Sequence, residues 1–422
     1  MRVIGGRWLA VTACAALLTA CSSVRPWLNT AMQADQVRSM HVNETRDPSL
    51  VMAVTISGGG ARAAAFGYGV LRELEDHEFD WRGRRLTLLE ATDLISAVSG
   101  GSIVAAYYAA FGRTGLPRFE HDFLRQDFQQ SLLGMMARPG NLRDLSSPWF
   151  GRAHLLARRL DTLYEGKTFA DLERNPRHPQ LIVTATDLAR GTGFEFTWDQ
   201  FTLICSDLGR VPLSFAVAAS SAVPLLLSPV TLRNYADRCP AEVQRLLDRA
   251  LMNGGLRQTF REVVIPPGSV HKVVLVVVNA EREPTHDIDA SDTVPGMFDV
   301  AETLLFGAGA RKTRETQEYL QDVIREWRKD LEAHAAAGAS VFAADADIHV
   351  IMVNLRDAAL HSDRRQLLRV PTAFTVSDSE VTELITAGRE VLRYSPDFQA
   401  PVRALGARGV FPSTRSVNMK EK

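Results

Sequence analysis

Ser99 stands at the end of an apolar run and is followed by two glycines. Residues 93–98 have the composition of a buried strand, and the small, apolar residues 103–110 have that of a helix. A serine in a sharp turn between a strand and a helix presents its Oγ, and the helix N-terminus favours negative charge beside it. The usual pattern is Gly-x-Ser-x-Gly, and here Ala97 takes the place of the first glycine. The pattern predicts a nucleophilic serine, with a plain strand-to-helix turn capped by serine as the alternative.

A glycine-rich loop precedes this serine in the chain. Residues 51–56 are β-branched and apolar, as in a buried strand, and residues 63–76 carry a helical apolar face. The loop between them contains Gly58, Gly59 and Gly60. Successive glycines let backbone N–H groups converge on one anion, either a phosphate or the oxyanion of a tetrahedral intermediate. Arg62 has three possible roles: it orders this loop, attracts a phosphate headgroup or is an ordinary surface residue.

The same glycines also fit a dinucleotide-binding fingerprint. Gly58, Gly60 and Ala63 have the required spacing, and Glu90 lies downstream where an acidic residue would bind a ribose. Two observations count against this alternative. A second glycine-serine turn follows within one supersecondary unit, and the N-terminus carries an export signal.

At this point the chain resembles the patatin-like phospholipases and their relatives, the cytosolic phospholipases. The resemblance rests on Ser-Gly-Gly-Gly-x-Arg followed by a Val-Ser-Gly-Gly-Ser elbow. Three further segments resemble the family in the right order: 181–188 and 191–196 its central strand and hairpin, and 216–224 its helix of small residues. The matches span about residues 50–280. They imply a three-layer α/β fold, with a mainly parallel central sheet flanked by helices and a nucleophile elbow. The alternation of strands and helices favours the same class.

The resemblance also implies a reaction. Ser99 would attack an acyl ester of a phospholipid or lysophospholipid, forming an acyl-enzyme that water hydrolyses. The N–H groups of Gly58, Gly59, Gly60 and Gly100 would form the oxyanion hole. No cofactor is implied, and the base would be the aspartate of a Ser–Asp dyad.

The dyad position departs from the family pattern. Where the family has Asp-Gly-Gly or Asp-Gly-Ala, this chain has Asn253-Gly254-Gly255. A neutral amide cannot accept the proton of a serine. Three accounts remain open: a degenerate hydrolase that still binds lipid or an envelope partner, a substitute carboxylate from Asp187 or Asp248, or deamidation of Asn253 to aspartate. A weaker fourth option is a triad that uses His271 or His349.

The N-terminus has the features of a bacterial lipoprotein signal. Residues 1–20 combine two arginines with a short apolar stretch, too short to span a bilayer. Residues 18–21 resemble a lipobox, which implies cleavage before Cys21 and lipidation of that cysteine. Several acyl chains would anchor the protein stably to the membrane. Because Ser22 follows, resemblance to lipoprotein sorting predicts the outer membrane, facing the periplasm.

Cysteine usage and charge bound the remaining possibilities. Cys205 and Cys239 remain once Cys14 is removed and Cys21 is modified, and in an oxidising compartment they are candidates for a disulfide. Two buried free thiols are the alternative. No Cys/His spacing suggests a metal site. The 422 residues have a net charge of −1, so nothing indicates a nucleic-acid partner.

The chain divides into four expected regions. Residues 1–20 are the signal peptide, 21–48 a tether without apolar periodicity, 49–280 the hydrolase core and 281–422 an extension packed on the core. Residues 271–280 form the strongest candidate strand. The extension contains an amphipathic helical region at 299–336, a strand at 348–355 and a helix that opens with a capping signature at 377–380. Its helices could instead form a lid or a surface that faces the membrane.

Overall fold

The chain folds as two compact units, in a computed structural model that describes residues 24–33, 47–175, 178–223, 226–252, 266, 268–281, 342–358 and 365–408. The elbow unit, named for Ser99, comprises residues 42–120, 177–181 and 264–422. The strap unit comprises residues 1–41, 121–176 and 182–263. The expected signal peptide, Cys21, Asn253 and the 299–336 region lie outside the described residues.

A parallel sheet forms the centre of the elbow unit. Its strands β4 (Leu94–Val98), β1 (Leu50–Ile56), β7 (Val270–Asn279) and β8 (Phe342–Asn354) lie side by side in that order. Every pairing among these four is parallel. Parallel strands buried by helices require continuous β-branched runs, which β1 and β7 supply. The predicted α/β class with a mainly parallel sheet is therefore confirmed.

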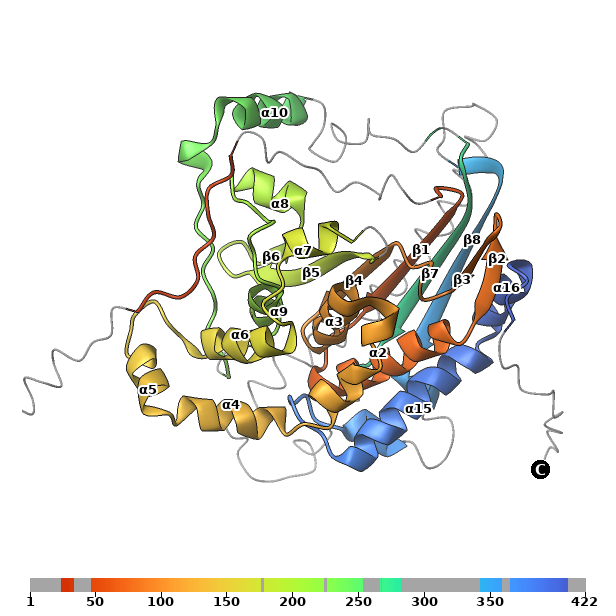
Figure 1. Ribbon diagram of the computed structural model, residues 1–422, viewed down its shortest axis with the longest axis horizontal. Helices are drawn as coiled ribbons and strands as arrows, with labels where there is room; N and C mark the ends of the chain where they lie inside the picture. The colour runs from red at the N-terminus through yellow and green to blue at the C-terminus, as the bar shows by residue number, and fades with distance from the viewer. Residues whose placement is uncertain are drawn as a thin grey trace, which may run out of the picture. The chain divides into compact units, whose positions relative to one another are not determined.

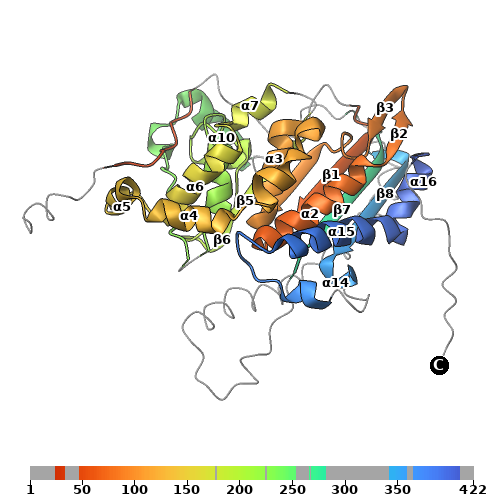
Figure 2. The same cartoon turned by 60° about the horizontal axis from the view of Figure 1, so that its bottom comes forward.

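Three helices cover one face of this sheet in the same order as its strands. Helix α3 (Gly100–Gly115) contacts β4 and β1, α2 (Gly60–Glu75) contacts β7, and α15 (Asp378–Tyr394) contacts β8. Figures 1 and 2 show α3, α2 and α15 side by side along the strands. The α15 helix begins at the predicted capping box, in which Ser377 and Glu380 bond each other's backbone N–H groups.

Helices α2 and α15 approach closely because each has a glycine at the contact. A methyl group on Gly69 would lie 2.2 Å from the carbonyl oxygen of Ile385. One on Gly388 would lie 2.3 Å from the carbonyl oxygen of Phe66. Helix α15 therefore packs on α2, and strand β8 adds to the sheet itself.

Smaller elements complete the elbow unit. They are the antiparallel ribbon of β2 (Glu78–Trp81) and β3 (Arg84–Thr87), the helices α14 (Leu355–Ala358) and α16 (Pro396–Ala404), and a 3-10 turn at Arg365–Arg369.

The strap unit is mainly helical. Its elements are α4 (Phe128–Met136), α5 (Pro139–Leu145), α6 (Arg152–Leu163), α7 (Phe169–Glu173), β6 (Thr192–Glu195), α8 (Trp198–Leu203), α9 (Leu213–Ser220), a 3-10 turn (Ala236–Arg238) and α10 (Ala241–Met252). Strand β5 (Gln180–Asp187) starts in the elbow unit and continues here, where it forms an antiparallel hairpin with β6. A π-helical turn, Glu120–Leu124, crosses the boundary between residues 120 and 121. Among the described helices, none is long and apolar enough to cross a membrane.

Residues 24–33, here called the strap, differ from the tether expected at 21–48. Ala31 forms an antiparallel bridge with Ser206, and the Met32 N–H donates to the carbonyl of Cys205 at 2.9 Å. Asn29 is 1% exposed, and its amide donates to Ser206 Oγ and to the carbonyl of Arg233. The strap packs through single residues and hydrogen bonds, so it has no apolar periodicity to detect.

Candidate active site

The register of β1 and β4 brings the glycine loop and Ser99 together. Ile56 pairs with Ala97, so these parallel strands end side by side at one edge of the sheet. The loop that leaves β1 and the turn that leaves β4 therefore start next to each other. A methyl group on Gly58 would lie 3.2 Å from Cβ of Ser99, which puts the Gly58 backbone against the serine side chain.

Ser99 adopts the strained backbone of a nucleophile elbow. Its φ is 52° and its ψ is −127°, a conformation that residues with a Cβ rarely adopt and that costs about 1–3 kcal/mol. The side chain is half-buried, and Ser102 holds the turn by donating its hydroxyl to the Ser99 carbonyl at 2.5 Å. Ala97 is buried at the position of the missing first glycine. The departure at Ala97 is therefore compatible with the turn.

Two helices begin at this point. The residue that precedes α2 is Gly59, and the residue that precedes α3 is Ser99 itself. Neither helix has a side-chain cap. The first N–H groups of a helix lack partners within the helix and carry a partial positive charge. Two such ends beside one serine form a suitable environment for an oxyanion on a substrate carbonyl.

The glycines of the loop and elbow are required by close contacts. Gly60 has φ +63°, and a methyl group there would lie 2.2 Å from the carbonyl oxygen of Ala373. A methyl group on Gly101 would lie 2.4 Å from the carbonyl oxygen of Ser57. The loop and the elbow therefore interlock through bare backbone, which is why side chains are absent at these positions.

Arg62 is a buried residue that orders the loop. It is 3% exposed, and its Nε donates to the carbonyl of Ala280 at 3.0 Å. Its guanidinium also donates to the carbonyl of Val370 and lies 3.5 Å from Thr372 Oγ1. The prediction of an ordinary surface residue is therefore wrong. These contacts support the role in which Arg62 orders the glycine loop.

The segment 370–373 is a part of the site that sequence reasoning missed. Ala373 accepts a hydrogen bond from the Ala61 N–H at 2.7 Å, in the first turn of α2. Together with the Arg62 contacts, this fixes the glycine loop from the C-terminal extension. More than 300 residues separate the partners, and no local pattern in the sequence signals such a contact.

The two aspartates considered as the base belong to a different unit from Ser99. Asp187 and Asp248 belong to the strap unit, whereas Ser99 belongs to the elbow unit. Asp187 ends β5, where its carboxylate accepts from the Ala189 N–H at 2.9 Å and closes the turn of the hairpin. Asp248 is exposed on α10, five residues before Asn253.

The two histidines considered for a triad lie away from Ser99 along the strands. His271 is the second residue of β7. It precedes Lys272, which pairs with Leu50, at the end of β1 opposite the glycine loop. The strand rise of about 3.3 Å per residue puts six residues, or about 20 Å, between Leu50 and Ile56. His349, on the edge strand β8, pairs with Val274, which in turn pairs with Met52, four residues before Ile56. Their partners are Asp345 and Asp347. The sheet register therefore argues against both as the base.

Cys205 and Cys239 form a disulfide in the strap unit, with their Cα atoms 5.5 Å apart. Met32 of the strap and Val243 of α10 are buried against Cys205. The bond therefore joins the segment after α8 to the segment before α10, beneath the strap. Among the described residues, no group of three or more His, Cys, Asp or Glu is arranged to hold a metal ion.

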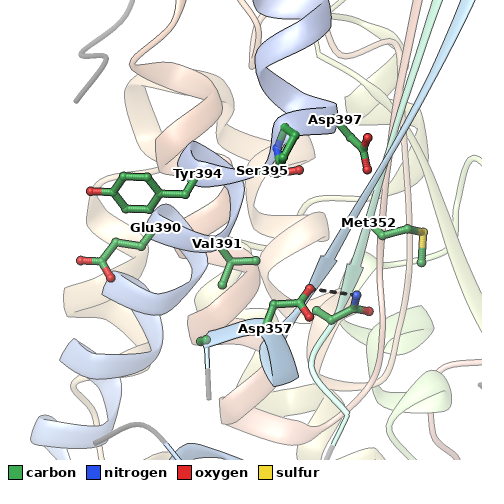
Figure 3. A pocket seen from close by; sticks show the side chains of 10 residues that line it. Met352, Asp357, Glu390, Val391, Tyr394, Ser395 and Asp397 are labelled. Carbon is green, nitrogen blue, oxygen red and sulfur yellow. Dashed lines mark hydrogen bonds between the residues drawn. The ribbon is translucent and has the colours of Figure 1, made fainter. Parts of the chain in front are cut away.

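A cavity of about 360 Å³ lies in the elbow unit at the junction of α15 and α16. Figure 3 shows the side chains of Asp357, Glu390 and Asp397 around it, with Asn354 bonded to Asp357. Ser99 and the glycine loop do not line it. The cavity is therefore separate from the site built around Ser99.

Comparisons with known proteins agree with the motifs. Residues 54–263 match the family model described as patatin-like phospholipase. A search of curated proteins found no match.

Among solved structures, the chain is similar to human GIVD cytosolic phospholipase A2 in complex with methyl gamma-linolenyl fluorophosphonate. The identity is 14%, the TM-score is 0.41, and the match covers 89% of this chain and 61% of the human one. It is also similar to the ExoU–SpcU complex of Pseudomonas aeruginosa, with 14% identity, a TM-score of 0.31 and coverage of 92% and 61%. It is similar, too, to VipD of Legionella pneumophila. The identity is 9%, the TM-score is 0.32, and the match covers 85% of this chain and 67% of VipD. The chain thus spans less than two thirds of the length of the first two.

The family model covers the glycine loop, Ser99 and Asn253. Through residues 54–263, the chain belongs to the patatin-like phospholipase family.

Proposed function

We propose that this protein is a membrane-anchored lipid acyl hydrolase that cleaves acyl esters of phospholipids or lysophospholipids. The observation that carries the proposal is the strained Ser99 elbow, at which two helix N-termini and the glycine loop meet. This arrangement suits acyl transfer, because it presents a hydroxyl and fixed dipoles to the same carbonyl group.

The proposed reaction has two steps. Ser99 Oγ attacks the ester carbonyl carbon, the oxyanion forms beside Gly58–Gly60 and Gly100, and the carbon–oxygen bond of the ester breaks. The alcohol leaves with the proton from Ser99. Water then attacks the acyl-enzyme, releases the fatty acid and restores the hydroxyl.

The proton of Ser99 needs an acceptor during the first step. Asn253 occupies the family's aspartate position in the sequence, and an amide cannot fill that role. The candidates are a carboxylate from Asp187 or Asp248, or an aspartate formed from Asn253 by deamidation. The mass of an active preparation decides the last: intact Asn253 throughout would exclude deamidation.

The location belongs to the same proposal. Cleavage before Cys21 and lipidation of that residue would hold the enzyme at the outer membrane, facing the periplasm. The substrate would then be part of the surface to which the enzyme is anchored.

Asn253 also supports a second candidate function. A patatin-like protein without a base would bind lipid, or an envelope partner, without turnover. Loss of a general base costs about 10²–10⁴-fold in rate, enough to silence a weak hydrolase.

The test combines a fluorophosphonate probe with phospholipid hydrolysis. We expect labelling and turnover in the parent, loss of both in Ser99→Ala, and an increase of about 10²-fold or more in Asn253→Asp. Ser379→Ala, at an exposed serine of α15, controls for labelling of surface hydroxyls. Turnover only in Asn253→Asp would favour the silent binding protein. No labelling or turnover in any of the variants would overturn the hydrolase proposal.

A further inference from the structure

Helices α4 and α5 present an unusually apolar surface. Leu133 on α4 is 51% exposed, Leu142 on α5 is 55% exposed, and Trp149, which follows α5, is 46% exposed. None of the residues of α5 is buried. A helix that leaves its apolar side chains in water points to a partner that covers them.

Arginines outnumber carboxylates in this stretch and the helix that follows it. Residues 127–161 contain Arg138, Arg143, Arg152, Arg158 and Arg159, against Asp127, Asp144 and Asp161. The whole chain has a net charge of −1. Arg138 and Arg143 are exposed; Arg143 directly follows Leu142, and Arg138 lies five residues after Leu133. Exposed leucine and tryptophan side chains interspersed with arginines are typical of protein surfaces that lie at a membrane interface.

Contacts from α6 hold this surface in place. Arg158 donates to Asn141 at 2.9 Å and to Asp144 at 2.7 Å, both on α5. Arg159 donates to Ser131 on α4 at 3.1 Å and lies over the ring of Phe128. The face is therefore a supported part of the strap unit.

The strap brings the N-terminal chain to this face. The Ser147 hydroxyl donates to the carbonyl of Val24 at 2.7 Å, and the Arg25 guanidinium lies 4.0 Å from the centre of the Trp149 ring. In Figures 1 and 2 the N-terminal end of the strap lies beside α5. Cys21 precedes Val24 by three residues, and three residues of chain span at most about 11 Å. A lipid on Cys21 would therefore enter the bilayer close to Trp149.

We propose that the face formed by Leu133, Leu142, Trp149, Arg138 and Arg143 binds the surface of a lipid bilayer that contains anionic headgroups. The leucines and the indole enter the interface, and the arginines contact the phosphates of anionic headgroups. The face orients the strap unit on the membrane to which the lipid attaches the chain. The inference shares the membrane location of the proposed function, but it does not depend on turnover.

The first test measures contact with lipid at Trp149. The full chain is bound to phosphatidylcholine vesicles containing phosphatidylglycerol, and tryptophan fluorescence is quenched with brominated lipids. We expect Trp149→Phe to lose at least half of the quenching, and Trp81→Phe, at a half-buried tryptophan of the elbow unit, to retain it. Equal quenching in the parent and in Trp149→Phe would overturn the proposal.

The second test changes the surface and leaves Trp149 in place. We expect the double variant Leu133→Asp/Leu142→Asp to reduce the quenching several-fold. The matched variant Leu188→Asp/Leu203→Asp, at two other exposed leucines of the strap unit, should leave it unchanged. Arg138→Gln/Arg143→Gln should remove the dependence on phosphatidylglycerol. Equal effects of the two leucine pairs would contradict the assigned face.

The readout is repeated in Ser99→Ala, where we expect the same quenching as in the parent. A failure of the hydrolase proposal would therefore leave this result intact. A face that binds a protein would show no lipid quenching in any variant, which would overturn the membrane assignment.

Discussion

Gly60 and Gly100 approach so closely that a methyl group on Gly100 would lie 2.1 Å from the carbonyl oxygen of Gly60. One glycine opens α2 and the other opens α3, so this contact joins the two helix N-termini that flank Ser99. The geometry of the site depends on bare backbone at this contact.

Gly100→Ala is therefore expected to destabilise the protein, although alanine has the higher helix propensity. Alanine in a helix is favoured over glycine by about 1 kcal/mol, but here the added methyl group overlaps Gly60. We expect a loss of about 1–3 kcal/mol in the free energy of unfolding and at least a tenfold loss of hydrolysis. Gly134→Ala on α4, where nothing lies within 4 Å, should be neutral or stabilising. Urea unfolding and probe labelling measure both, and a Gly100→Ala protein with parental behaviour would contradict the interlocked site.

Arg62 gives a prediction about stability and activity together. In Arg62→Met the carbonyls of Ala280 and Val370 lose a charged donor in a buried place. Hydrogen bonds to charged groups contribute about 1.5–3 kcal/mol each, so we expect a loss of about 3 kcal/mol or more in the free energy of unfolding. Hydrolysis should also fall, because the glycine loop loses its support.

Arg82→Met is the control for Arg62→Met. Arg82 is exposed and pairs with Asp47 at 3.3 Å, a contact that contributes at most about 1 kcal/mol. The Arg82 variant should keep both stability and activity. If the two variants unfold at the same urea concentration, Arg62 does not order the loop.

The disulfide is expected to stabilise the strap unit. Cys205 and Cys239 are 34 residues apart, and closing a loop of that length lowers the entropy of the unfolded chain by an amount equivalent to about 3–4 kcal/mol. Cys205→Ser/Cys239→Ser should lower the melting temperature in an oxidising buffer. Adding a reductant should lower it in the parent but not in the double variant. A melting temperature insensitive to reductant in both would show that the bond does not form or does not stabilise.

The elbow could be predicted from the sequence because its signals are local. Glycines, a serine and apolar runs at fixed spacing specify a strand, a turn and a helix, and the structure has β4, Ser99 and α3 there. The capping box before α15 was recognisable for the same reason. Short-range backbone chemistry decides these features, so the sequence pattern is sufficient.

Arg62 and the strap were not predictable in this way. The burial of Arg62 depends on Val370 and Thr372, which arrive from the other end of the chain. Asn29 depends on Ser206 and Arg233. A single polar residue whose hydrogen-bond partners lie far away in the chain produces no repeating pattern in the sequence. Its burial can therefore be recognised only in the folded structure.

His154 gives the strap unit a dependence on pH. Burial lowers the pKa of His154 below its usual value of 6.5, and the charge of Arg158 lowers it further. Below pH 6.5 the unfolded chain therefore binds a proton more readily than the folded one. The free energy of unfolding should decrease as the pH falls from 7 to 5, by at most about 1.4 kcal/mol per pH unit from this group.

His154→Gln isolates that contribution. The variant should lose part of the decrease between pH 7 and pH 5 in urea unfolding, because glutamine does not take up a proton. His121→Gln, at an exposed histidine, controls for the removal of an imidazole that is not packed.

His154 also packs against Phe150, and the Arg158 guanidinium lies over the Phe150 ring. Protonation of His154 would therefore also act on the support of the proposed membrane-binding face. We therefore expect bromolipid quenching at Trp149 to weaken at pH 5 in the parent and less so in His154→Gln. Equal pH profiles in parent and variant would rule out this histidine as the source.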